Sequence, residues 1–283
     1  MKTVRFWSDQ GLLPEVDRSS GGHRRYAPEA VERLRLIRSL RTLDMPLPAV
    51  ARVLDGEADE DLHAAVATQL GTVTAELTAL RWREAALRLL HEAAPDQRVE
   101  LLRLVGALGA RPSTDTFVRY WRRLLPTRLS VRLTTAIIDS AVPPLPVQPS
   151  PQQVLAFARL HALTGAVTDA CLVDHRPVVP RPDVLYDGLS EAYELAVPAL
   201  RAGCGPAEGE ALDCFVAAYA RSYGQSDTPA VRRDLGRALA RGEHPAMRRY
   251  WQLAGDLTPQ PTLGAAHAWL SSALSAQLAA EAD

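Results

Sequence analysis

The stretch that decides the fold runs from Thr3 to Tyr26 and reads TVRFWSDQGLLPEVDRSSGGHRRY. Its first part predicts a short helix over Val4–Gln10, for which Thr3 is a suitable N-cap. Gly11 follows at the position where a helix commonly ends in a left-handed residue. The chain is then expected to leave this helix in an extended form and to enter a basic segment.

The basic segment, Arg18–Tyr26, predicts a two-stranded ribbon. Gly21 and Gly22 can supply the positive φ angles that a tight hairpin requires, and the charged residues beside them keep the ribbon solvated. Seven arginines lie between Arg18 and Arg41, against only two acidic residues. A local excess of positive charge attracts phosphate groups even though the whole chain has a formal net charge of −1.

Two further helices are predicted after the ribbon. Pro28 suits the first turn of a helix that runs to about Leu43, and a shorter helix covers Ala49–Leu54 and ends at Gly56. The longer helix has a predicted apolar face that consists of Val31, Leu34, Ile37, Leu40 and Leu43.

The order of these elements resembles the winged helix-turn-helix of the MerR family of transcription regulators, over residues 3 to about 92. The resemblance implies that the helix from Val4 is the recognition helix, that the ribbon is the wing, and that both contact double-stranded promoter DNA. Arg5 is the natural base or phosphate contact, because a guanidinium can form two parallel hydrogen bonds. The residues expected to contact DNA are Lys2, Thr3, Arg5, Phe6, Arg18, His23, Arg24, Arg25 and Tyr26.

The sequence departs from the family pattern in two places. Phe6 stands where a tyrosine often supplies a hydroxyl to a phosphate, so that contact is not expected here. The family's first helix would precede Thr3, where this sequence has only Met1 and Lys2. Two explanations are open: a start further upstream, or a DNA-binding unit that has lost this helix. Without that helix, apolar cover is expected to be lost from Val4, Trp7 and Leu12.

A long helix is predicted over Leu62–His91. Its apolar residues recur in steps of four and three from Val66 to Leu80; Glu84 interrupts the spacing and Leu87 resumes it. This pattern is the seam of a coiled coil. A single helix cannot bury such a stripe, and the resemblance implies antiparallel pairing with the same helix of a second subunit. An ordinary core helix of one domain is the alternative. The predicted dimerisation residues are Val66, Leu70, Val73, Leu77, Leu80 and Leu87.

The remainder of the chain predicts only helices, from near residue 96 to about 281. The predicted fold class is mainly α: a winged helix-turn-helix head with a small β-wing, a long antiparallel coiled-coil dimerisation helix and an all-α carboxy-terminal domain. The expected domains are residues 1–56 (incomplete at the amino terminus), 57–94 and 95–283. Two proline-rich segments, 143–151 and 177–182, are expected to pack as extended crossings on the helical domain.

Aromatic residues gather in the carboxy-terminal region, where an Arg-Tyr-Trp pattern occurs at 119–121 and again at 249–251. The recurrence indicates either two related helical halves or a coincidence. An aromatic pocket with acidic companions (Asp187, Glu191, Glu194, Asp213) suits a flat or cationic organic compound; the alternative is that these aromatic side chains form only core. The candidate ligand-binding residues are Trp121, Tyr193, Tyr219, Tyr223 and Trp251.

Several classes of protein and of site are not expected from this sequence. The chain shows no signal peptide and no apolar run of membrane length, so we expect a cytoplasmic protein without membrane contact. No cysteine precedes Cys171, which argues against a thiolate metal site at the dimer helix, and Cys171 with His175 is only a weak zinc signal. Because no catalytic or phosphate-binding motif occurs, no enzyme activity, cofactor or metal is expected.

Together these features predict a homodimeric transcription regulator that responds to a small organic effector. By resemblance to the family, the dimer binds a pseudo-palindromic promoter and distorts it, so that the two contact elements of RNA polymerase realign. The alternative is a helical protein that binds or sequesters a small molecule, such as a drug or antibiotic, and whose DNA-binding head is vestigial.

Overall fold

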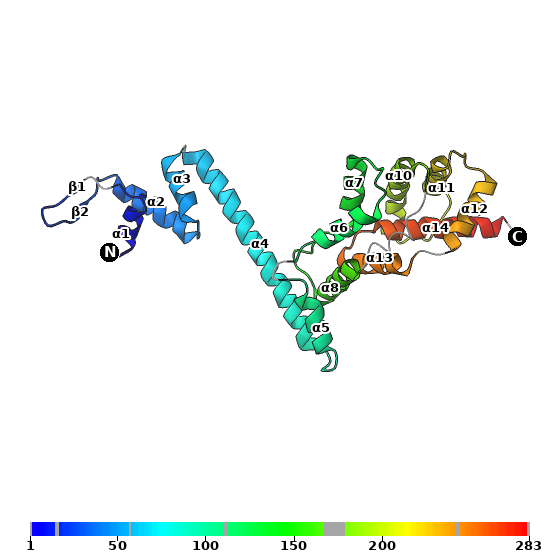
Figure 1. The fold of residues 1–283 in the computed structure, drawn as a ribbon, viewed down its shortest axis with the longest axis horizontal. Coiled ribbons are helices and arrows are strands. Elements are labelled where there is room, and N and C mark those ends of the chain that lie inside the picture. Colours follow the sequence, from blue (N-terminus) through cyan, green and yellow to red (C-terminus); the bar gives the residue numbers. More distant parts are fainter. Residues whose placement is uncertain are drawn as a thin grey trace. The chain divides into compact units, whose positions relative to one another are not determined.

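The computed structural model describes residues 2–14, 17–56, 58–109, 112–166, 179–241 and 244–281. These residues are mainly helical, as predicted, with a small two-stranded sheet (Figure 1). The chain divides into two compact units, Met1–Leu77 and Thr78–Asp283. The division falls inside the long helix α4 (Ala58–Glu92). Within the described ranges, no helix combines the length and the apolarity needed to cross a membrane.

The first unit contains the elements predicted around the opening stretch. In chain order they are α1 (Lys2–Asp9), β1 (Asp17–Arg18), β2 (Arg24–Arg25), α2 (Ala30–Thr42), α3 (Leu47–Asp55) and the first part of α4. The ends of α1, α2 and α3 differ from the predicted ends by no more than two residues. Local signals, namely a glycine stop after α1 and prolines at the start of α3, therefore determined these helices.

The core of the first unit forms around Trp7, Leu12 and Leu13. These side chains pack against buried residues of α2, α3 and α4, namely Ile37, Leu40, Met45, Val50, Val53 and Ala65. The expected loss of apolar cover is wrong for Trp7 and Leu12, which are 8% and 3% exposed, because α2 and α3 close over them. Val4 is half-buried against the same cluster.

The predicted apolar face of α2 is buried only at its centre. Ile37 and Leu40 are buried and Leu34 is half-buried, whereas Val31 and Leu43 are exposed. The expectation that all five residues form one core face is therefore wrong at both ends of α2, because the cover from α1 and α3 reaches only the central turns.

The second unit contains the rest of α4 and the helices that follow it. They are α5 (Arg98–Gly106), α6 (Asp115–Leu124), α7 (Val131–Ala141), α8 (Pro151–Ala166), α10 (Pro182–Arg201), α11 (Glu210–Ser222), α12 (Pro229–Ala240), α13 (Pro245–Leu257) and α14 (Leu263–Ala280). Helix α8 packs along α13, α10 packs along α11, and α14 contacts each helix from α10 to α13 (Figure 1).

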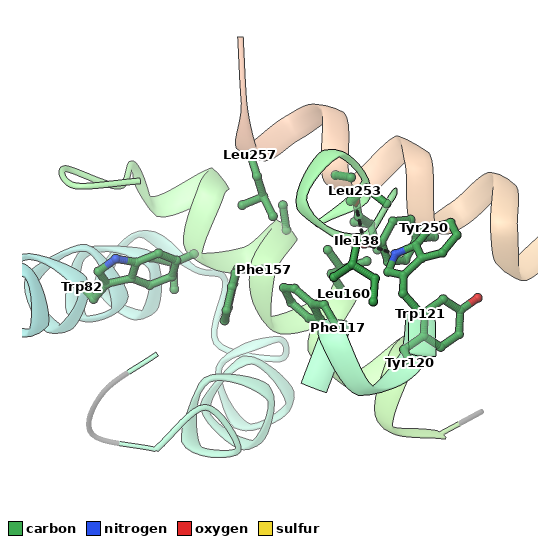
Figure 2. Packing of buried hydrophobic residues seen from close by; sticks show 14 of the residues in the cluster. Trp82, Phe117, Tyr120, Trp121, Ile138, Phe157, Leu160, Tyr250, Leu253 and Leu257 are labelled. Atoms are coloured by element: carbon green, nitrogen blue, oxygen red, sulfur yellow. Dashed lines mark hydrogen bonds between the residues drawn. The ribbon is translucent and has the colours of Figure 1, made fainter. Parts of the chain in front are cut away.

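Two apolar clusters hold the second unit together. One joins α4, α6, α8 and α13 through Trp82, Phe117, Phe157 and Tyr250 (Figure 2). The other joins α10, α11 and α14 through Leu189, Phe215 and Leu270. The indole N–H of Trp82 donates to the carbonyl of Pro146 (3.0 Å), so the proline-rich segment 143–151 packs on this unit as predicted. Residues 177 and 178 of the second such segment and the Cys171–His175 pair lie outside the described residues. Within the described part of that segment, Val179 packs against the second cluster.

Candidate functional site

Helix α1 presents a polar surface on one side and Trp7 to the core on the other. Thr3, Arg5 and Phe6 are exposed, while Trp7 is buried. The helix ends because Gly11 takes a positive φ of 77°, and the N–H of Leu12 donates to the Trp7 carbonyl (2.9 Å). The side chain of Lys2, another expected DNA contact, lies outside the described residues.

The wing is an antiparallel pair in which Asp17 faces Arg25 and Arg18 faces Arg24. Its turn closes through hydrogen bonds from the Gly22 N–H to the Ser19 carbonyl and from the Ser19 N–H to the His23 carbonyl, both 2.8 Å. Only Gly22 has a positive φ (75°), so the expectation that Gly21 also needs one is wrong. The expected contacts Arg18, His23 and Arg25 are exposed, and Tyr26 is half-buried against the core of the first unit.

Arg24 connects the wing to α1. Its guanidinium donates to the carbonyl of Arg5 (3.3 Å) and pairs with the Asp9 carboxylate. The sequence grouped Arg24 with the DNA contacts, but in the structure much of its hydrogen-bonding capacity is used within the protein. Arg24 therefore holds the wing beside the exposed side of α1.

Arg33 is a positioning residue that sequence reasoning missed. From α2, its Nε donates to the carbonyl of Leu12 (2.7 Å), and its two terminal nitrogens contact the carbonyl of Leu54 (3.0 Å) and the carboxylate of Asp55 (2.5 Å). One side chain thus joins the turn after α1 to the end of α3. The sequence carries no signal for this role, because the three partners come from separate elements.

The predicted dimerisation residues form an exposed stripe on α4, which we call the α4 stripe: Val66, Leu70, Val73, Leu77, Leu80 and Leu87. Their exposed fractions lie between 43% and 64%. The alternative of an ordinary core helix does not fit these residues, because the described part of the chain does not bury them. The α4 stripe is an apolar surface that the chain leaves open.

The second unit contains a cavity of about 330 Å³ whose walls come from α6, α7, α10, α11, α13 and α14. Four of the predicted ligand-binding residues line it: Trp121, Tyr193, Tyr219 and Trp251. The fifth, Tyr223, is not in the wall; it follows the last turn of α11 and is 53% exposed. The i, i+4 spacing from Tyr219 suggested a shared face, but α11 ends at Ser222 and Tyr223 turns to solvent.

The Tyr-Trp pairs of the recurring pattern, at 120–121 and 250–251, pack against one another beside this cavity. The indole N–H of Trp121 donates to the hydroxyl of Tyr250 (2.7 Å), which donates to the carbonyl of Ala141 (2.9 Å; Figure 2). The rings of Tyr120 and Tyr250 are stacked with centroids 5.6 Å apart, and those of Trp121 and Trp251 lie 5.3 Å apart. The two copies of the pattern therefore build one aromatic wall.

Tyr250→Phe is expected to lower the free energy of unfolding of the second unit by about 2 kcal/mol. The reason is that the substitution leaves two buried groups, the Trp121 N–H and the Ala141 carbonyl, without their shared partner. Urea denaturation followed by tryptophan fluorescence measures this loss. Tyr223→Phe, which removes an exposed hydroxyl, is the matched control, and equal stability of the two variants would contradict the assigned role of Tyr250.

The cavity wall has no acidic side chain among the described residues, which corrects one sequence-based expectation. Among the residues described, no lysine, arginine, aspartate or glutamate lines it. The predicted acidic companions Asp187, Glu191, Glu194 and Asp213 are all exposed, because they occupy the solvent-facing sides of α10 and α11. His267 does line the cavity, and burial lowers its pKa to about 4, so its ring is neutral near pH 7.

Comparison with known proteins identifies the domain that contains α1 and the wing. Residues 1–57 match the family model described as MerR HTH family regulatory protein. The amino-terminal domain belongs to the MerR family. Its MerR match includes the exposed side of α1, the wing, α2 and α3, and it ends before α4.

Individual relatives of the MerR domain are similar over about a third of this chain or less. The mercuric resistance operon regulatory protein of Serratia marcescens is 33% identical over 90 residues, which are 31% of this chain and 62% of that protein. The transcriptional activator TipA of Streptomyces coelicolor is 36% identical over 93 residues, 33% of this chain and 36% of TipA. The ZntR homolog of Haemophilus influenzae is 37% identical over 57 residues, 20% of this chain and 42% of that regulator.

The chain thus spans less than two thirds of each of these relatives. No solved structure shows a match to it. The aromatic cavity lies outside the 57 residues of the MerR family match.

Proposed function

We propose that this chain is a homodimeric, DNA-binding transcription regulator of the MerR type whose second unit binds a small organic effector. The observation that carries this proposal is the exposed basic surface that α1 and the wing form within the MerR domain. The dimer binds a pseudo-palindromic promoter, and effector binding distorts that DNA so that RNA polymerase contacts both promoter elements. The chain itself carries out no catalysis.

In this proposal α1 enters the major groove, which admits one helix, and Arg5 contacts a base edge or a phosphate. The wing places Arg18 and Arg25 against the neighbouring backbone, where cations contribute affinity without reading sequence. Arg24 and Arg33 act within the protein: the first holds the wing to α1, and the second holds the turn after α1 to α3. The surface is thus rigidly supported before DNA binds.

The second subunit is the partner that we assign to the α4 stripe. Its steps of four and three residues are those of a coiled-coil seam, and the stripe faces solvent in the single chain. A two-fold dimer covers the same surface on both subunits and presents two copies of α1 to the two halves of a pseudo-palindrome.

The cavity in the second unit supports the effector part of the proposal. Its volume of about 330 Å³ lies within the range of about 300–1,000 Å³ that is usual for small-molecule pockets. Aromatic rings make up much of its wall, with a few hydroxyl and imidazole groups between them. Such a wall selects a small organic compound.

Arg25→Ala is expected to weaken binding to the promoter of the protein's own gene about tenfold, and to reduce the salt dependence of binding by about one phosphate contact. The reason is that Arg25 is an exposed cation on the wing. Fluorescence anisotropy with a labelled promoter fragment at several salt concentrations measures both quantities.

The matched control is Arg237→Ala, which removes an exposed arginine of α12 in the second unit. If both substitutions weaken promoter binding equally, the loss of affinity results from the change in net charge and not from a contact made by Arg25. Absence of salt-sensitive binding by the unchanged chain would reject the regulator proposal.

A ligand-sequestering protein is the second candidate, because the cavity lies wholly outside the MerR match. This candidate requires tight binding of a small molecule that leaves promoter affinity unchanged. The same anisotropy measurement, repeated with and without ligand, separates the two functions.

A further inference from the structure

Two phenol hydroxyls in the cavity wall have no hydrogen-bond partner among the described residues. Tyr186 lies on α10 and Tyr219 on α11, and both side chains are half-buried in the wall. Two fully buried hydroxyls of this unit are paired: Tyr250 with Trp121 and Ala141, and Thr164 with the Leu160 carbonyl. The buried Ser271 hydroxyl, which does not line the cavity, has no partner among the described residues. An enclosed polar group without a partner is unfavourable, and such groups commonly bind water or a ligand.

The packing of α10 on α11 fixes both phenols at one wall of the cavity. The helices approach closely where Gly188 meets Ala218, since a Cβ on Gly188 would lie 2.7 Å from the Ala218 Cβ. Burial raises the pKa of Tyr186, and burial together with the neighbouring phenols raises the pKa of Tyr219. Both hydroxyls therefore stay protonated and are available as donors.

A third polar group completes this side of the cavity. The Nδ1 of His267 forms a hydrogen bond with the Tyr193 hydroxyl (2.9 Å). Its Nε2 has no partner among the residues that the structure describes, and it can donate or accept according to the tautomer.

The wall has no permanently charged side chain, among the described residues, that could form an ion pair with a charged ligand. It carries no lysine, arginine, aspartate or glutamate among the described residues. Of its two histidines, His267 is neutral near pH 7 because burial lowers its pKa, and His244 accepts a hydrogen bond at Nδ1 from the Ala246 N–H (3.2 Å). A cation or an anion would lose its hydration on entry without gaining an ion pair. The cost of desolvation is much smaller for a neutral compound.

Ring geometry and volume restrict the shape of the ligand. Trp121 and Trp251 lie 5.3 Å apart, and Tyr120 adds another ring to the same wall. Aromatic faces and edges favour planar ligands. A volume of about 330 Å³ is at the lower end of the usual range, which suits a fused-ring compound rather than a peptide or macrocycle.

We propose that the cavity binds an uncharged, planar aromatic compound whose carbonyl or ether oxygens accept hydrogen bonds from the hydroxyls of Tyr186 and Tyr219. The inference rests on the proposed effector-binding role and specifies the chemistry of the effector. Tyr186 and Tyr219 are specificity-determining residues in this scheme, and the tryptophans supply the stacking surface.

The test is isothermal titration calorimetry of the full chain with four probes of similar ring frame. Xanthone is neutral and has a carbonyl acceptor, xanthene lacks that carbonyl, a xanthone carboxylate is an anion, and proflavine is a cation. We expect xanthone to bind most tightly and the two charged probes to bind at least about tenfold more weakly.

The double variant Tyr186→Phe/Tyr219→Phe is expected to bind xanthone more weakly, by about two- to tenfold for each hydroxyl removed. It should also lose the preference for xanthone over xanthene. Tyr223→Phe, on the same helix end but outside the wall, should retain both. A purely structural role of the phenols would not change the xanthone preference selectively.

Tightest binding of a charged probe, absence of xanthone binding, or an unchanged preference in the double variant would each overturn the inference. These outcomes are distinct from failure of the regulator proposal. If xanthone binds as expected but promoter affinity does not respond to it, effector control is rejected and the cavity assignment stands.

Discussion

Leu70→Glu is expected to be monomeric at concentrations at which the unchanged chain is a dimer. Leu70 is the most exposed member of the α4 stripe, at 64%, so glutamate at this position leaves the single chain almost unaffected. In the proposed dimer the same position lies in an apolar seam, and the two-fold symmetry introduces the charge twice.

The expected effect on dimerisation is large. Each leucine withdrawn from the seam forfeits about 1.5–3 kcal/mol of burial, hence about 3–6 kcal/mol for the pair. This corresponds to an increase of the dissociation constant by more than about a hundredfold. Promoter affinity should fall with it, because a monomer presents only one copy of α1.

Ala75→Glu is the matched control, because at 100° per residue it lies on the side of α4 opposite the stripe. Light scattering after gel filtration gives the mass of the unchanged chain and of both variants. If the Leu70→Glu variant is a dimer, or if the unchanged chain is a monomer, the assignment of the α4 stripe as the dimer interface is wrong.

Gly264→Ala is expected to lower the free energy of unfolding of the second unit by about 3 kcal/mol and to prevent ligand binding. Gly264 lies in the first turn of α14, and a Cβ there would overlap the indole ring of Trp251. The indole cannot move aside freely, because the rings of Trp121 and Tyr250 lie 5.3 and 5.0 Å from it. Movement into the cavity is the remaining direction, and it fills the proposed binding space.

Gly255→Ala, inside α13, provides the control for the backbone effect of the same substitution. A Cβ on Gly255 would meet nothing within 4 Å, so this variant should be as stable as the unchanged chain or gain up to about 1 kcal/mol. Thermal and urea denaturation compare the two variants. Adding Trp251→Phe to Gly264→Ala should restore part of the lost stability, and equal stability of Gly264→Ala and Gly255→Ala would refute the assigned packing.

The elements of the first unit could be predicted because their signals are local. Gly11 ends α1, Gly22 turns the wing, and the prolines near residue 46 start α3. The α4 stripe was likewise visible as a spacing within one helix. The roles of Arg24 and Arg33 could not be predicted. The sequence does not distinguish an arginine that donates to a carbonyl of another element from one that is solvated.

The helices, the basic wing and the apolar stripe could be predicted from the amino-acid order, since each depends on residues only a few positions apart. The packing of distant helices was needed to show that Trp121 and Tyr250, 129 positions apart, share a hydrogen bond and that their neighbours enclose a cavity. It was also needed to show that the nearby acids face solvent and that Tyr223 lies outside the wall. The physical reason is that helical spacing defines which face a residue occupies, whereas the neighbour of that face depends on how distant helices pack.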